Sequence, residues 1–66
     1  MYLILLDCST GEVIKIRLTE EEMADMKNHE DTEEFIMEHL EKRYHFRLSD
    51  CSWMLADELM ERTYNM

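Results

Sequence analysis

The sequence predicts a small α+β domain with an N-terminal β-hairpin, two helices packed on one face of it, and a third strand near the C-terminus. Three observations predict this fold class. Two apolar runs, residues 2–6 and 13–18, flank a polar turn. Capping signals for two successive helices follow, at Thr19 and at Asp31. A chain of 66 residues has the length of one domain, so we expect residues 1–66 to form a single unit.

The first apolar run is too short for a helix and apolar throughout, which is typical of an inner strand covered on both faces. The run over residues 13–18 alternates between apolar and charged side chains and predicts a strand with one wet face. Gly11, the only glycine, can close a three-residue loop between them in the left-handed conformation. That loop places Cys8 opposite Glu12.

The predicted register brings apolar side chains together across the hairpin. The pairs are Leu6 with Ile14, Ile4 with Ile16, and Tyr2 with Leu18. We expect the helices to pack on this face, the Ile4 and Ile16 face. Leu3, Leu5 and Val13 then lie on the opposite face, for which little chain remains as cover. The register therefore predicts a second, less covered sheet face.

The first helix begins with the run Thr19-Glu20-Glu21-Glu22, which has the form of a capping box. In this motif the side chains of Thr19 and Glu22 each accept a hydrogen bond from the other residue's backbone N–H. The apolar pattern ends at Met26. A polar connector over residues 27–31 follows.

The second helix is predicted from Asp31 or Thr32 onward. Its buried stripe is expected to contain Phe35, Ile36, His39, Leu40 and Tyr44. His45, followed by an apolar residue, stands where a C-cap would end the helix.

The segment from residue 51 to 56 fits two structures. Cys51, Trp53 and Leu55 alternate with Ser52, Met54 and Ala56, which predicts a third strand. A cap at Ser49 or Asp50 would instead start a third helix through residue 60. The strand is favoured, because an inner first strand needs a neighbour on both sides. A short helical or frayed tail follows residue 56.

The net charge of the chain restricts the kinds of partner that it can bind. Sixteen acidic and seven basic residues give a net charge of -9, a field that repels phosphate backbones and anionic membranes. We therefore expect a protein partner, with no direct nucleic-acid and no membrane binding. Cys8 and Cys51 match no metal or redox spacing, and the N-terminal apolar run is too short for a signal peptide, so we expect free thiols in the cytoplasm.

No motif for catalysis or cofactor binding is present in the sequence. His29 lies beside Glu30 and Asp31, a loose group that we expect to bind nothing specific. His39 and His45 are six residues apart and do not share a helix face. The sequence therefore predicts neither an enzyme, nor a cofactor, nor a metal site.

The hairpin turn and the following capped helix resemble the start of a ubiquitin-like β-grasp domain over residues 1–26. The second helix and the lack of a fourth strand depart from that pattern. The resemblance implies nothing about function.

The expected function is that of a non-enzymatic interaction module that binds another protein or a second copy of itself through a sheet face or edge. The candidate interaction residues are Leu3, Leu5, Val13, Trp53 and Met54. The alternative is an acidic decoy that mimics nucleic acid and binds a basic protein surface. The second helix would serve it through Glu34, Glu38 and Glu41.

Overall fold

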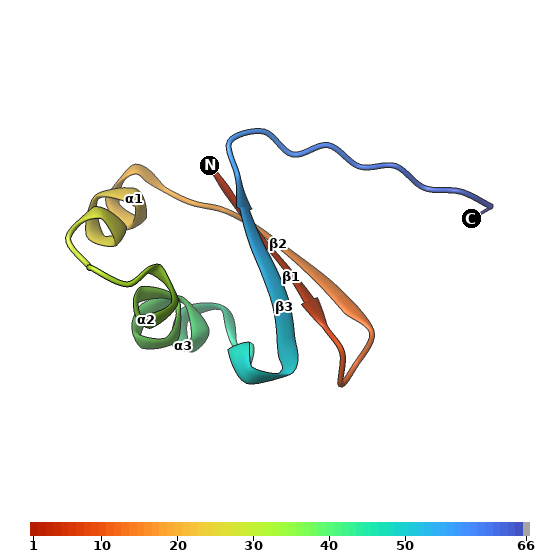
Figure 1. The fold of residues 1–66 in the computed structure, drawn as a ribbon, viewed down its shortest axis with the longest axis horizontal. Helices are drawn as coiled ribbons and strands as arrows, with labels where there is room; N and C mark the ends of the chain where they lie inside the picture. The colour runs from red at the N-terminus through yellow and green to blue at the C-terminus, as the bar shows by residue number, and fades with distance from the viewer. Residues whose placement is uncertain (66) are drawn as a thin grey trace.

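The computed structural model describes residues 1–65, which form an antiparallel three-stranded sheet with helices on one side (Figure 1). Strand β1 (Tyr2–Asp7) lies between β2 (Glu12–Arg17) and β3 (Cys51–Ala56). The predicted α+β class and the inner position of the first strand are confirmed. An inner strand has sheet neighbours on both edges, which explains why residues 2–6 are apolar throughout.

Residues Cys51–Ala56 form a strand, and the alternative of a third helix is wrong. β3 pairs with β1 over its whole length, from Tyr2 opposite Ala56 to Asp7 opposite Cys51. Residues 57–65, which we call the C-terminal arm, contain no helix or strand and extend away from the sheet (Figure 1).

The hairpin register differs from the predicted one by one residue. Leu6 lies opposite Val13 and not Ile14, and the last pair before the loop is Asp7 with Glu12. Ile14 and Ile16 still face the helices, but their neighbours on β1 are Leu5 and Leu3. A one-residue shift moves every side chain of a strand to the other face. The prediction that the helices pack on the Ile4 side of β1 is therefore wrong.

Asp7 is the physical reason for this register. Its carboxylate accepts hydrogen bonds from the backbone N–H and the hydroxyl of Ser9, at 2.9 and 2.6 Å, and its carbonyl accepts from the N–H of Gly11 at 2.8 Å. These bonds place Asp7 at the base of a four-residue loop, residues 8–11, with Gly11 left-handed at φ 74°. A local side-chain turn thus replaced the predicted three-residue loop.

Helix α1 (Glu20–Lys27) begins with the predicted capping box. The Glu22 N–H donates to the Thr19 hydroxyl at 3.1 Å, and the Thr19 N–H donates to the Glu22 carboxylate at 2.9 Å. This arrangement satisfies two backbone donors that the first turn of a helix otherwise leaves free.

A second helical stretch consists of α2 (Thr32–Phe35), a π-helical turn (Ile36–Leu40) and α3 (Glu41–Tyr44). His45 ends it in the left-handed conformation, φ 58°, as the sequence predicted. The predicted stripe is only partly correct: its three apolar members are buried, but His39 and Tyr44 are exposed. The π turn inserts an extra residue into the helical repeat, so a pattern counted at 3.6 residues per turn loses its phase there.

Glu22 connects the two helical stretches. It is only 1% exposed, and its carboxylate also accepts hydrogen bonds from the Arg43 guanidinium at 2.7 Å and the Tyr44 hydroxyl at 2.9 Å. Burial raises the pKa of this carboxyl group, but the hydrogen bonds from Thr19, Tyr44 and Arg43 outweigh burial and hold the pKa below its usual value. A charged, fully hydrogen-bonded carboxylate therefore joins α1 to α3.

The hydrophobic core fills the single layer between the sheet and the helices. Leu3 and Leu5 of β1 are fully enclosed there, together with Phe35, Ile36 and Leu40 at 1% exposure. Within the described residues, no helix is long and apolar enough to cross a membrane.

Candidate functional site: the open face of the sheet

Among residues 1–65, no helix or strand covers the sheet face that points away from the helices. We call its side chains the open face. By the register of the three strands they are Tyr2, Ile4, Leu6, Val13, Lys15, Arg17, Ser52, Met54 and Ala56. Leu6, Val13 and Met54 are 50%, 56% and 53% exposed. Three large apolar side chains that share one face make a patch, which has more meaning than single exposed residues.

Charge on the open face is the reverse of charge on the chain as a whole. Although the chain carries sixteen acidic residues, none of the side chains of the open face is acidic, and Lys15 and Arg17 supply positive charge. The Lys15 ammonium contacts the carboxylate of Glu61 in the C-terminal arm at 2.6 Å. The open face is therefore apolar and cationic, and an acidic group already lies on it.

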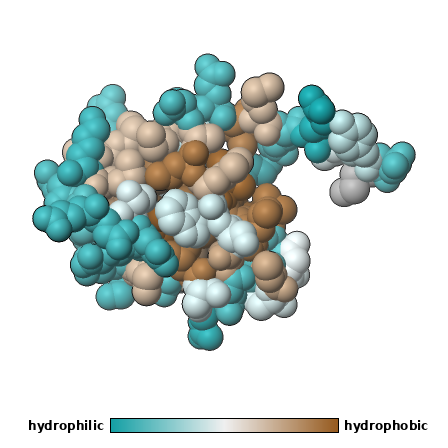
Figure 2. Space-filling model, viewed as in Figure 1, coloured by the Kyte–Doolittle hydropathy of each residue, from teal (hydrophilic) through white to brown (hydrophobic). Residues whose placement is uncertain are grey.

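A shallow groove of about 270 Å³ runs along the open face between β1 and β3. Ile4, Leu6, Ser52 and Met54 of the open face line it, together with Trp53, whose position in β3 is on the core side. In a surface view, hydrophobic residues gather over the strands, whereas hydrophilic residues cover the helices on the left (Figure 2). The groove is thus a largely apolar depression on the side of the molecule that lacks helices.

The five predicted interaction residues separate into two groups. Val13 and Met54 lie on the open face and are exposed. Leu3 and Leu5 are 0% exposed, so their predicted place on the less covered face is wrong, because the shifted register turns them toward the helices. Trp53 lies beside Leu5 on the core side and is half-buried against the core.

The sequence reasoning missed Leu6 as an exposed residue of the open face and assigned it to the core. Asp7 was the residue that could have shown this position of Leu6. An Asp side chain favours a turn that starts at its own position, one residue before the predicted turn.

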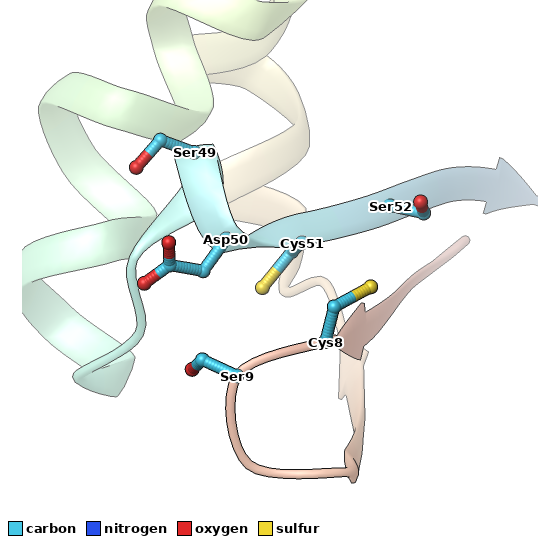
Figure 3. A pocket seen from close by; sticks show the side chains of 6 residues that line it. All are labelled: Cys8, Ser9, Ser49, Asp50, Cys51 and Ser52. Carbon is cyan, nitrogen blue, oxygen red and sulfur yellow. The ribbon is translucent and has the colours of Figure 1, made fainter.

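A second hollow lies where the hairpin loop meets the 3₁₀ turn Leu48–Asp50 before β3 (Figure 3). Its volume is about 470 Å³, and it is lined by Cys8, Ser9, Ser49, Asp50, Cys51 and Ser52. The backbone N–H of Cys8 donates to the carbonyl of Asp50 at 2.9 Å and holds the two loops together.

The two cysteines in this hollow are free thiols, and their sulfur atoms point away from each other (Figure 3). Burial raises the pKa of the Cys51 thiol, and the carboxylates of Asp7 and Asp50 raise it further. A raised pKa keeps a thiol protonated and weakly nucleophilic. Cys51 is therefore not an activated nucleophile.

A third group of polar side chains lies on the helical layer. His29, Glu38 and His39 bring three potential metal-ligand atoms within 4.8 Å of one another. The Asp25 carbonyl accepts a hydrogen bond from Nδ1 of His29 at 2.9 Å and thereby raises the pKa of His29. Burial lowers this pKa, whereas the nearby Glu38 carboxylate raises it further. The sequence reasoning missed the group because it placed His39 in the buried stripe and compared His29 only with its neighbours in the connector.

Comparison of the chain with protein-family models, with curated proteins and with solved structures gave no match.

Proposed function

We propose that this protein is a non-enzymatic interaction module, and that its open face binds the C-terminal arm of a second copy. The observation that carries the proposal is the open face itself: three half-exposed apolar side chains and two cations, with no carboxylate among the strand residues of that face. A contiguous apolar patch on a small domain is typical of a protein interface.

The chemistry of the arm supports a second copy as the occupant. Arm residues Asp57, Glu58 and Glu61 are acidic, and Met60 and Tyr64 are 86% and 68% exposed. An extended acidic and apolar segment is complementary to an apolar and cationic face. The contact between Glu61 and Lys15 supports this match within one chain. Exchange of an arm between two copies reuses contacts of this kind, as in domain swapping.

Chain length gives an independent reason for association. A domain of 66 residues buries a smaller fraction of its surface than a larger domain does, and small folds without disulfides often gain stability by forming oligomers. Both cysteines are free thiols. Covering Leu6, Val13 and Met54 in a dimer would remove their apolar surface from water, at about 25 cal/mol per Å².

The decisive experiment measures molar mass by size-exclusion chromatography with light scattering across the micromolar range. The full chain is expected to be a dimer, and Lys15→Glu and Glu61→Lys, each alone, are expected to weaken it several-fold by placing like charges together. Mixing the two variants restores complementary pairs only between different chains. We therefore expect the mixture to recover the dimer.

A pair of methionine variants tests the apolar part of the interface. Met54 on the open face and Met37 on the helical layer are equally exposed, at 53% and 50%. Met54→Ser is expected to shift the chain toward monomer, and Met37→Ser is the matched control with no such shift. A wild-type chain that stays monomeric at every concentration, or a mixture of the charge variants that remains monomeric, would refute the proposal.

The second candidate function is the acidic decoy, favoured by the uneven distribution of charge. Glu34 and Glu38 are exposed on the helical layer, opposite the cationic open face. Glu41 is less available, because its carboxylate accepts a hydrogen bond from the Leu48 N–H at 3.1 Å. A decoy would displace nucleic acid from a basic domain with steep salt dependence. Glu34→Gln is expected to weaken the displacement of nucleic acid, and Glu61→Gln is the control with no such effect. Displacement that does not change with salt concentration would exclude the decoy function.

A further inference from the structure

We propose that His29, Glu38 and His39 bind one divalent transition-metal ion of the zinc type. Their potential ligand atoms lie within 4.8 Å of one another. Nε2 of His29 is 3.5 Å from Oε2 of Glu38. Bonds of about 2.0–2.1 Å in tetrahedral geometry place ligand atoms about 3.3–3.5 Å apart, so this pair already has the spacing of two ligands of one ion.

The third ligand is a ring nitrogen of His39. The rings of His29 and His39 meet edge to face with centroids 5.1 Å apart, and each also packs against Phe35, at 5.3 and 5.2 Å. Phe35 is buried, whereas His39 is exposed and can adjust its side chain. A small rotation of His39 toward Glu38 completes a set of two imidazoles and one carboxylate, with a fourth position left for water.

The π-helical turn explains how neighbouring residues reach one ion. In an α-helix, successive side chains point about 100° apart. A π turn closes its hydrogen bonds five residues back, here from the Glu41 N–H to the Ile36 carbonyl, and so reduces that angle. Glu38 and His39 therefore lie closer to one side of the helix than the same residues would in an α-helix. Single π turns are frequent at functional sites.

A hydrogen bond prepares His29 to act as a ligand. Nδ1 lies 2.9 Å from the carbonyl oxygen of Asp25, which can only accept, so Nδ1 carries the proton. In the neutral ring this leaves the lone pair on Nε2, the atom that faces Glu38. Metal-binding histidines commonly donate their second ring N–H to a backbone carbonyl in this way, which fixes both tautomer and orientation.

The ligand types select the class of ion. Imidazole nitrogen suits zinc, copper, nickel and cobalt, whereas calcium and magnesium take oxygen ligands almost exclusively. Binding would connect the segment after α1 to the π turn on the helical layer, on the side of the sheet opposite the open face. The inference is therefore independent of the proposed interface.

Titration calorimetry of the full chain with zinc chloride tests the site. We expect one zinc ion per chain, with no binding of magnesium or calcium. Glu38→Gln and His39→Gln change exposed side chains, so both variants should fold, as circular dichroism can check. Each is expected to weaken zinc binding at least tenfold, because removing even a hydrogen-bond partner of a metal ligand costs about 10- to 100-fold in affinity.

Two controls remove other possible ligands. His45→Asn deletes a histidine outside the group while keeping a residue that tolerates the left-handed conformation, and Cys8→Ser combined with Cys51→Ser deletes both thiols. Neither change should affect zinc affinity, and zinc should shift the ring resonances of His29 and His39 but not of His45. Absence of one-to-one binding, or equal affinity in wild type and His39→Gln, would overturn the inference.

Discussion

Leu5 and Leu6 are adjacent residues of the same type in the same strand, yet their environments are opposite. Leu5 is 0% exposed beneath the helices and Leu6 is 50% exposed on the open face. In the part of the chain that the structure describes, the helices cover one side of the sheet and only the C-terminal arm lies near the other. A strand that is apolar throughout therefore indicates that burial is favourable on both faces of the sheet. It does not indicate which face the helices of the same chain cover.

The largest expected effect tests this contrast directly. Leu5→Ala should destabilise the fold by about 2–5 kcal/mol, because it leaves a cavity in a packed core. Leu6→Ala should cost only about 0.5 kcal/mol, as is usual for a surface position. Urea denaturation, at a concentration where the chain is monomeric, gives both values. Equal losses at the two positions would mean that the open face is already covered in the monomer.

The second prediction compares an ion pair whose carboxylate is buried, Glu22 with Arg43 on the helical side, with a pair on the open side in which both partners are exposed. Glu22→Gln should cost about 2 kcal/mol, because Arg43, Tyr44 and the Thr19 N–H lose a charged acceptor. Lys15→Ala should cost less than about 1 kcal/mol, since both partners of the Lys15 and Glu61 pair are well exposed. The same denaturation series measures both.

The Glu22 effect has a defined pH dependence. Because the pKa of Glu22 is lower in the folded chain than its ordinary value of 4.5, its contribution is fully present above pH 4.5. That contribution is lost as pH falls through the folded pKa. The stability difference between wild type and Glu22→Gln should therefore shrink below pH 4.5. A difference that stays constant with pH would show that Glu22 acts by shape alone.

The last comparison concerns two of the residues with left-handed backbone, one after the helices and one in the hairpin loop. His45 has φ 58° after α3, and Gly11 has φ 74° in the hairpin loop. His45→Gly should stabilise the fold by about 1 kcal/mol, and Gly11→Ala should destabilise it by about as much, although a methyl group there meets no atom within 4 Å. Thermal unfolding of both variants checks the opposite signs.

Local signals in the sequence predicted a large part of this fold. The capping box at Thr19 and the C-cap at His45 depend on neighbouring residues, and both are present in the structure. β3 was predicted from a tertiary argument, the need of an inner strand for two neighbours, when periodicity alone allowed a helix.

The predictions of the hairpin register and of the buried helical stripe were wrong where a single side chain or an extra residue shifts the apolar repeat. Asp7 begins the turn one residue earlier than predicted. As a result Leu5, and not Leu6, faces the core. The π turn, which no simple periodicity reveals, exposes His39 and brings it beside His29. The link from Glu22 to Arg43 joins residues far apart in the chain, so no local motif could have predicted it.

The position of β1 between β2 and β3 has a consequence for folding on the ribosome. β1 and β2 can pair as soon as they leave the exit tunnel, whereas β3 is synthesised after all the helices. Until then one edge of the nascent hairpin stays unpaired and its leucines lack cover, a state prone to association with other chains. Pairing between distant segments also slows folding. The last strand therefore acts as the closing step, and a chaperone would have the greatest effect before its synthesis.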